Sequence, residues 1–268
     1  MTAISSKAKK EIYALIDKLV LKYIKKAEKE GGLSNSGNPF VMALFSDFEP
    51  MLHSIHGLKT SLGGEMEKIA EIIANDAWGV KNVKRKTKRE VVLPKNVYSA
   101  IDTILNNLSN AKTLSNYYLE KEQIKKALKL GNKERESHTY EFDLEIHDEE
   151  KKHYYFMEMK GPDPNTTEVP GAKRRLLAEL AWGYQNLKAR DIDAPFAIYY
   201  NNKFPKPYKN PKVLYYFNPD GGLLVHERFW NFIGKNEKTY GELVKIFESY
   251  GKVNKEKIWD NFSKLIKK

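Results

Sequence analysis

The sequence contains no cysteine, which excludes disulfides and thiolate metal sites. It has no apolar run approaching the roughly 18 residues of a membrane-spanning helix, and its first residues, MTAISSKAKKEIY, lack the apolar core of a signal peptide. We therefore expect a cytoplasmic protein. A P-loop, a dinucleotide fingerprint and a nucleophile elbow are also missing, so the common nucleotide-binding and serine-hydrolase motifs give no explanation of function.

Acidic residues are fewer than basic ones. Lysine and arginine number 46 against 35 aspartates and glutamates, which gives the 268-residue chain a net charge of +11. This balance favours a polyanionic partner, with nucleic acid ahead of an anionic membrane surface. The length suits one sizeable core, and neither a repeat nor a low-complexity linker divides it, so we expect a single domain over residues 1–268.

The spacing of apolar residues changes after Gly131, from helical to strand-like. We therefore expect residues 1–135 to be mostly helical and residues 136–268 to carry the catalytic sheet and C-terminal helices, an α/β (α+β) protein. The predicted helices cover 4–27, 56–78, 97–108, 115–130 and 171–190 and recur from 227 to 268, and the predicted strands cover 140–146, 153–160, 195–201 and 212–217. Residues 33–45 read as a loop that enters a short apolar element.

The first two strands flank a charged turn centred between Glu150 and Lys151. If they pair antiparallel around that turn, opposite residues have numbers that sum to 301. Asp143 then faces Glu158, and Lys160 lies on the same side of the sheet two residues further along. Three ionisable groups are thus predicted to converge at one end of a hairpin.

Two carboxylates one cross-strand spacing apart repel each other unless a cation lies between them. Oxygen ligands select a hard ion, and Mg²⁺ is the best candidate. Such an ion, bound by Asp143 and Glu158, would polarise a phosphoryl oxygen and lower the pKa of a bound water, which phosphodiester hydrolysis requires. The ammonium of Lys160 would orient that water or stabilise the developing charge.

An ordinary cross-strand salt bridge is the alternative, because Glu-x-Lys alone is weak evidence. The turn residues Glu149 to Lys152 match the same pattern twice. The metal site is favoured by the context of Glu158, which follows an aromatic strand, faces Asp143 and precedes a basic helix. The break at Gly161-Pro162 would also leave Lys160 at an open edge that DNA could approach.

Together, Phe142-Asp143, Glu158-Met159-Lys160 and the helix that follows resemble the PD-(D/E)xK nuclease signature, with Phe142 where the signature has proline. More narrowly, the segments NPF, HGLKTSLGGEMEKIAEIIA, YEFDLEI and FMEMKGPDPNT resemble type II restriction endonucleases of the TdeIII/MjaII family. The resemblance covers most of the chain. It implies a restriction-endonuclease-like mixed β-sheet flanked by helices, and Mg²⁺-dependent cleavage of double-stranded DNA that leaves 5′-phosphates.

The same resemblance implies a homodimer, a palindromic GGNCC site and a cognate DNA methyltransferase in the same system that is not a stable subunit. It further implies that a glutamate on the preceding helix supports the metal, and we choose Glu65 over Glu67 and Glu71. Asp143, Glu158, Lys160 and Glu65 are therefore the candidate catalytic residues.

Candidate DNA-contacting residues lie in a basic run, in the polar loop past Lys160 and at the start of the next helix. They are Lys84, Arg85, Lys86, Lys88 and Arg89, then Asn165, Thr166 and Thr167, then Lys173 and Arg174. A solvated loop and an ordinary turn explain the first two groups equally well. Two other functions stay open: a nuclease of the same fold that acts on structured or damaged DNA, and a basic DNA-binding protein without catalysis.

Overall fold

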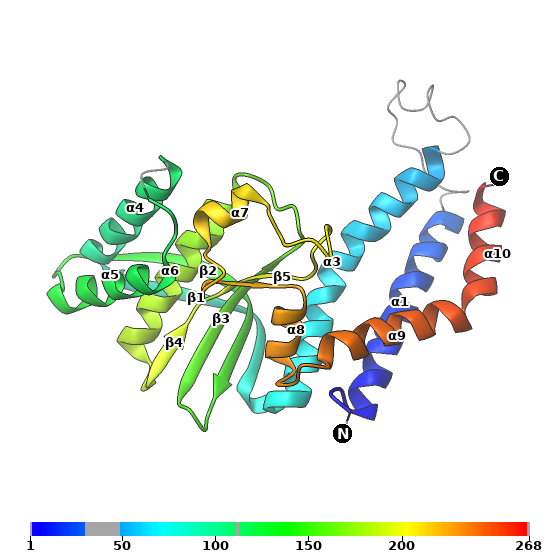
Figure 1. Ribbon diagram of the computed structural model, residues 1–268, viewed down its shortest axis with the longest axis horizontal. Helices are drawn as coiled ribbons and strands as arrows, with labels where there is room; N and C mark the ends of the chain where they lie inside the picture. Colours follow the sequence, from blue (N-terminus) through cyan, green and yellow to red (C-terminus); the bar gives the residue numbers. More distant parts are fainter. Residues whose placement is uncertain (1, 30–48, 111–112, 267–268) are drawn as a thin grey trace.

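The structure, a computed structural model, describes residues 2–29, 49–110 and 113–266 (Figure 1). The prediction for residues 33–45, and with it the NPF segment, lies outside the described residues. Within them the protein is a mixed α/β structure, a six-stranded sheet flanked by helices. The predicted fold class is confirmed.

The sheet has the strand order β1-β2-β3-β5-β6, and β4 pairs with β3. The first three strands are antiparallel, whereas β3 pairs parallel with β4 and β5, and β5 parallel with β6. The strands are β1 (Val83–Pro94), β2 (Arg135–Asp148), β3 (His153–Lys160), β4 (Asp191–Asp193), β5 (Phe196–Ile198) and β6 (Leu223–Val225).

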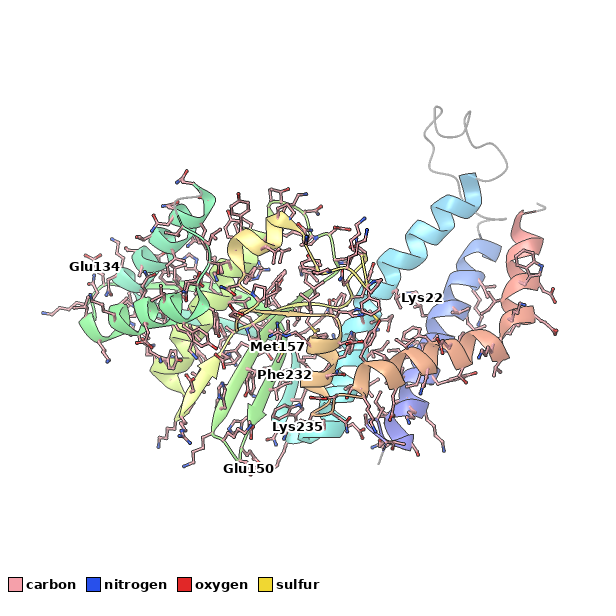
Figure 2. All side chains as sticks on the ribbon, viewed as in Figure 1. Lys22, Glu134, Glu150, Met157, Phe232 and Lys235 are labelled. Carbon is pink, nitrogen blue, oxygen red and sulfur yellow. The ribbon has the colours of Figure 1, made fainter. Side chains whose placement is uncertain are left out.

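The β2–β3 hairpin has the register that the sequence predicted. Its paired residues run from Leu144 opposite Met157 to Asp148 opposite His153, so that each pair sums to 301. Figure 2 shows the turn, marked by Glu150, at one end of the hairpin and Met157 well inside the sheet. Strand β5 pairs with the other end of β3, where Lys160 lies opposite Ile198.

Helices cover both faces of the sheet. Figure 1 shows α4, α5 and α6 on one side, α3 and α8 on the other, and α1, α9 and α10 beyond α3. The helices are α1 (Ser6–Lys29), α3 (Glu49–Trp78), α4 (Lys95–Ser109), α5 (Tyr117–Leu130), α6 (Glu168–Asn186), α7 (Pro211–Tyr216), α8 (Glu227–Ile233), α9 (Thr239–Val253) and α10 (Lys255–Ile266), with the 3-10 turn η2 (Val80–Asn82) before β1.

The alternation of side chains along β3 explains the two cores. Met157 and Met159 are buried with residues of α1, α3, α8 and α9, whereas Phe156 is buried on the opposite face with residues of α6. A strand with both faces covered carries a continuous apolar run, as this one does. Glu158 has the same parity as Phe156 and therefore points toward α6.

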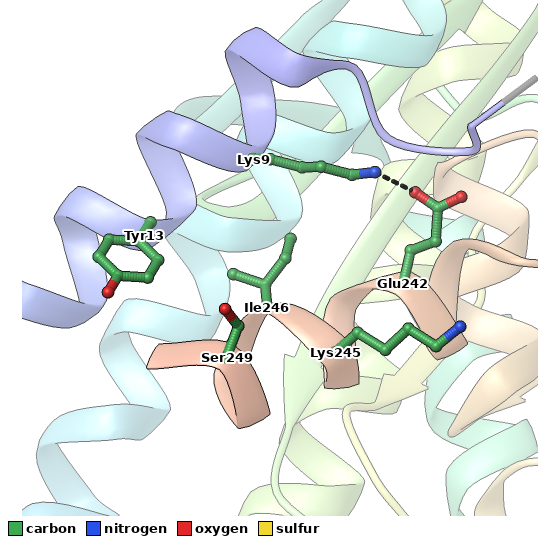
Figure 3. A pocket seen from close by; sticks show the side chains of 6 residues that line it. All are labelled: Lys9, Tyr13, Glu242, Lys245, Ile246 and Ser249. Atoms are coloured by element: carbon green, nitrogen blue, oxygen red, sulfur yellow. Dashed lines mark ion pairs between the residues drawn. The ribbon is translucent and has the colours of Figure 1, made fainter. Parts of the chain in front are cut away.

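Helix α9 returns to pack on α1, as Figure 3 shows. Lys9 Nζ lies 2.8 Å from Glu242 Oε2, and Tyr13 and Ile246 line a shallow pocket beside this ion pair. Carboxylate Glu242 also accepts a hydrogen bond from the backbone N–H of Ala3, which fixes the chain just before α1. In the described residues, no helix combines the length and the apolar character needed to cross a membrane.

One predicted strand was wrong, and one observed strand was not predicted. Residues 212–217 form the helix α7 rather than a strand, because Pro211 opens the helix and the Asn210 side chain accepts a hydrogen bond from Lys212 N–H. The basic run forms strand β1 rather than a loop, because pairing with β2 lets it bury Val91 and Leu93. Strand β1 therefore interrupts the region predicted to be mostly helical.

Candidate active site

Asp143, Glu158 and Lys160 meet at the end of the hairpin away from its turn. Asp143 lies one residue beyond the last β2–β3 pair, and its Oδ2 accepts a hydrogen bond of 2.7 Å from Met159 N–H. Lys160 Nζ lies 3.0 Å from Glu158 Oε1 and 4.0 Å from Asp143 Oδ2. The structure thus brings together the three groups that the strand register placed on one side.

Burial changes the charge balance of this group. Burial and the neighbouring Glu158 charge raise the pKa of Asp143 to about 6, against the opposing effects of Met159 N–H and Lys160. For Lys160, burial lowers the pKa, but the carboxylates of Glu158 and Asp143 outweigh burial, so the pKa is raised overall. The charged form of Asp143 is therefore disfavoured in this site, and a further cation beside it would offset that effect.

Arg175, which we did not select from the sequence, also contacts the site. It lies on the second turn of α6, and its Nη2 forms an ion pair with Glu158 Oε1, the same oxygen that Lys160 contacts. The Glu158 side chain is only 4% exposed, so both cations compensate a carboxylate with little access to water. The signal in the sequence was the run of Lys173 to Arg175, but only helix packing reveals which member points at β3.

Helix α3 brings glutamates toward the same end of the sheet. Glu65 Oε1 lies 2.7 Å from Lys68 Nζ, one turn along the same helix. Glu67 Oε2 lies 3.3 Å from Lys86 Nζ of β1, and the Glu67 charge contributes to the raised pKa of Asp143. Both glutamates have a buried Oε2 atom without a hydrogen bond in the described part of the chain.

Tyr199 directly follows β5, and its buried hydroxyl donates a 3.5 Å hydrogen bond to Met159 C=O. Burial raises the pKa of its hydroxyl, and the charges of Glu67, Asp143 and Glu158 raise it further. The charge of Glu67 thus acts on both Tyr199 and Asp143.

Most basic residues of β1 have acidic partners. Lys84 lies 3.9 Å from Glu145 Oε1, and Arg85 Nε donates a 2.7 Å hydrogen bond to Glu71. The remaining pairs are Arg85 and Lys86 with Glu67, and Arg89 with Glu145 and Glu179. Lys88 is exposed, with no ion pair among the described residues.

The other predicted DNA contacts lie in different environments. Asn165, Thr166 and Thr167 are exposed in the loop between β3 and α6, on the side of Lys160. Lys173 is 2% exposed and paired with Glu120 of α5, and burial lowers its pKa. This burial argues against a DNA contact by Lys173. Arg174 is partly exposed and pairs with Asp102 of α4.

A second cluster of possible metal ligands lies at the opposite end of β3. His153, Asp191 and Asp193 offer ligand atoms within 4.8 Å of one another. However, Lys121 Nζ lies 3.1 Å from Asp191 Oδ2 and 2.8 Å from Asp193 Oδ1. Because the Lys121 ammonium lies between the two carboxylates, their charge is already compensated, and we do not assign a metal site here.

Comparison with known proteins agrees with the geometry. Residues 2–251 match the sequence model of the family described as type II restriction endonuclease, HinfI. The chain is also 24% identical over 214 residues to the type II restriction enzyme MjaII of Methanocaldococcus jannaschii, a match that covers 74% of this chain. The match spans 54% of the length of that enzyme. This chain belongs to the HinfI family of type II restriction endonucleases.

Proposed function

We propose that this protein is a type II restriction endonuclease that hydrolyses phosphodiester bonds of double-stranded DNA at a short palindromic site. The observation that carries the proposal is the convergence of Asp143, Glu158 and Lys160 at the end of β3 away from the hairpin turn. Family membership supports the same reaction. The resemblance of the sequence extends the proposal to the site GGNCC, a homodimer, a cognate methyltransferase and a cytoplasmic location.

The donor set fits a divalent cation, and Mg²⁺ is the ion we propose. Asp143 and Glu158 supply carboxylate oxygens, the ligands that hard ions prefer. Burial, and after it the neighbouring charge of Glu158, raise the pKa of Asp143, so the charged form of Asp143 is disfavoured even with Lys160 beside it. Asp143 and Glu158 would hold the ion, and a glutamate of α3 would support it. A bound divalent ion would neutralise charge on the scissile phosphate and lower the pKa of the attacking water.

Each protein group then has a defined task. Lys160, with its ammonium 3.0 Å from Glu158, orients the attacking water or stabilises the negative charge that develops on the phosphate. Met159 N–H holds the Asp143 carboxylate in a fixed direction. Arg175 compensates Glu158 and fixes its position relative to Lys160. Rigid support of this kind is what precise alignment of reacting groups requires.

For the supporting glutamate, the geometry favours Glu67 over our sequence-based choice of Glu65. The charge of Glu67 acts on Asp143 and Tyr199, whereas Glu65 is paired with Lys68 on its own helix. Glu67 also lies beside Lys86 of β1, so it points from α3 toward the sheet. We therefore propose Glu67 as the carboxylate of α3 that supports the metal.

Replacing Asp143 by asparagine tests the proposal. The substitution keeps the size and the acceptor for Met159 N–H but removes one charge, so cleavage should fall by at least about a thousandfold. DNA binding should be preserved or strengthened, because a repelling charge has gone. The measurements are plasmid cleavage with Mg²⁺ and gel retardation without it. Cleavage by the variant at the wild-type rate would refute the assignment of the site.

A further inference from the structure

Four exposed lysines lie on the segment that follows β5. We define the lysine segment as residues 199–212, with the sequence YYNNKFPKPYKNPK, which contains no aspartate or glutamate. It is the yellow stretch that joins β5 to α7 in Figure 1. Its four lysines are exposed, and none forms an ion pair within the part of the chain that the structure describes. They are Lys203, Lys206, Lys209 and Lys212.

The lysine segment begins at the catalytic end of the sheet. Ile198, the last residue of β5, pairs with Lys160, and Tyr199 N–H donates a 3.1 Å hydrogen bond to Lys160 C=O. On its other side, Trp230 Nε1 donates a 2.7 Å hydrogen bond to Tyr199 C=O. The chain thus leaves the sheet directly beside the residue proposed to act on the phosphate.

Hydrogen bonds fasten the lysine segment to the loop after β3. The Tyr208 hydroxyl donates to Pro162 C=O at 2.7 Å, and Asn210 Nδ2 donates to the same carbonyl at 3.1 Å. Asn202 Nδ2 donates to Asp163 Oδ2 at 2.6 Å. Because these contacts lie at both ends of the run of lysines, the segment and the loop that holds Asn165 to Thr167 form one surface.

The charge on this surface differs from that of β1. The cations of β1 are mostly paired with carboxylates of α3, β2 and α6, so their charge is compensated within the protein. The lysine segment carries four lysines at a spacing of three residues. Asp163, in the neighbouring loop after β3, accepts hydrogen bonds from Asn202 and Asn210 and forms no ion pair with these lysines. Uncompensated lysines beside a phosphodiesterase site attract phosphates.

We propose that the lysine segment is a principal phosphate-contacting surface of this protein and holds the DNA backbone against the site at Lys160. This inference rests on the proposed function and names the residues through which the substrate binds. Each lysine that contacts a phosphate displaces counterions from the DNA. Its removal should therefore lower the slope of log affinity against log salt by about 0.9. Phosphate contacts position the duplex without reading its sequence.

The test compares two double variants that lose the same charge. Lys203→Gln/Lys206→Gln alters the lysine segment. Lys152→Gln/Lys188→Gln alters exposed lysines near the start of β3 and β4, about 23 Å along the sheet from Lys160. DNA binding is measured without divalent metal, from 50 to 300 mM salt, and cleavage of the same DNA by the wild type is measured with Mg²⁺.

We expect the lysine-segment variant to lower the slope of log affinity against log salt by about 2 and to bind about tenfold more weakly at 100 mM salt, with the control at wild-type values. If the wild type cleaves the DNA but the lysine-segment variant has the same slope of log affinity against log salt as the wild type, this inference is overturned and the proposed function stands. A wild type that neither cleaves nor binds DNA would overturn both.

Discussion

At the scale of single residues, the carboxylate of Glu158 is the centre of the charge balance. It is almost fully buried and shares one oxygen between Lys160 and Arg175, whereas Asp143 has a backbone N–H and a more distant ammonium. Asp143 is therefore the carboxylate whose charge is less completely compensated, which agrees with its raised pKa. Asp143 is therefore the carboxylate of this pair to which an added cation would contribute most.

Glu67→Gln and Glu65→Gln form a matched pair of variants on one helix. We expect Glu67→Gln to raise the Mg²⁺ concentration for half-maximal cleavage by about tenfold or more, because residues that support a metal change its affinity by that amount. Glu65→Gln should change this concentration less than threefold, since its partner is Lys68. The measurement is the cleavage rate across a Mg²⁺ titration. The opposite order of the two variants would restore Glu65 as the supporting residue.

At the scale of elements, α6 connects the site to the rest of the fold. Its first half contains Arg175, which forms the ion pair with Glu158. Its second half packs closely on the sheet at Gly183. A Cβ atom at Gly183 would lie 2.6 Å from Ile192 Cδ1 of β4 and 3.1 Å from Phe156 Cε2 of β3. Glycine at this position therefore permits the approach of α6 that brings Arg175 to the hairpin.

Gly183→Ala should destabilise the protein by about 1–3 kcal/mol, the usual effect of overpacking a filled core. Gly171→Ala in the first turn of the same helix is the control. There the new Cβ would meet only Arg175 Nη1 at 3.6 Å, so the better helix former should stabilise by about 0.5 kcal/mol. Urea unfolding measures both values. Equal stability of the two variants would contradict the close approach at Gly183.

The elements also show what a single sequence can predict. The hairpin register followed from the charged turn and the period of two, and it brought Asp143, Glu158 and Lys160 together. Strand β1 was missed because its basic residues resemble a solvated loop until their partners on α3, β2 and α6 are known. Arg175 and Glu67 were not selected for the same reason: their roles depend on how α6 and α3 pack.

At the scale of the whole molecule, the basic residues that give the net charge of +11 fall into two groups. Some cations join elements internally, as Arg89 does between β2 and α6, and Lys121 between α5 and β4. Arg89 also lies 3.9 Å from the centre of the Trp182 ring, so its role includes packing. The four exposed lysines of the lysine segment, which form no ion pair among the described residues, lie at the end of the sheet that carries the site. A run of basic residues in a sequence thus locates a DNA surface only after its acidic neighbours are known.

Digestion of unmethylated DNA, followed by sequencing of the fragment ends, tests whether Lys160 acts in Mg²⁺-dependent cleavage at a specific site. Wild type and Lys160→Ala are compared with Mg²⁺ and with a chelator. We expect discrete fragments that share one end sequence for the wild type with Mg²⁺, and intact DNA for the variant and for the chelated wild type. Wild-type protein that retards DNA but does not cleave it, or a Lys160→Ala variant that yields the same fragments, would contradict this expectation.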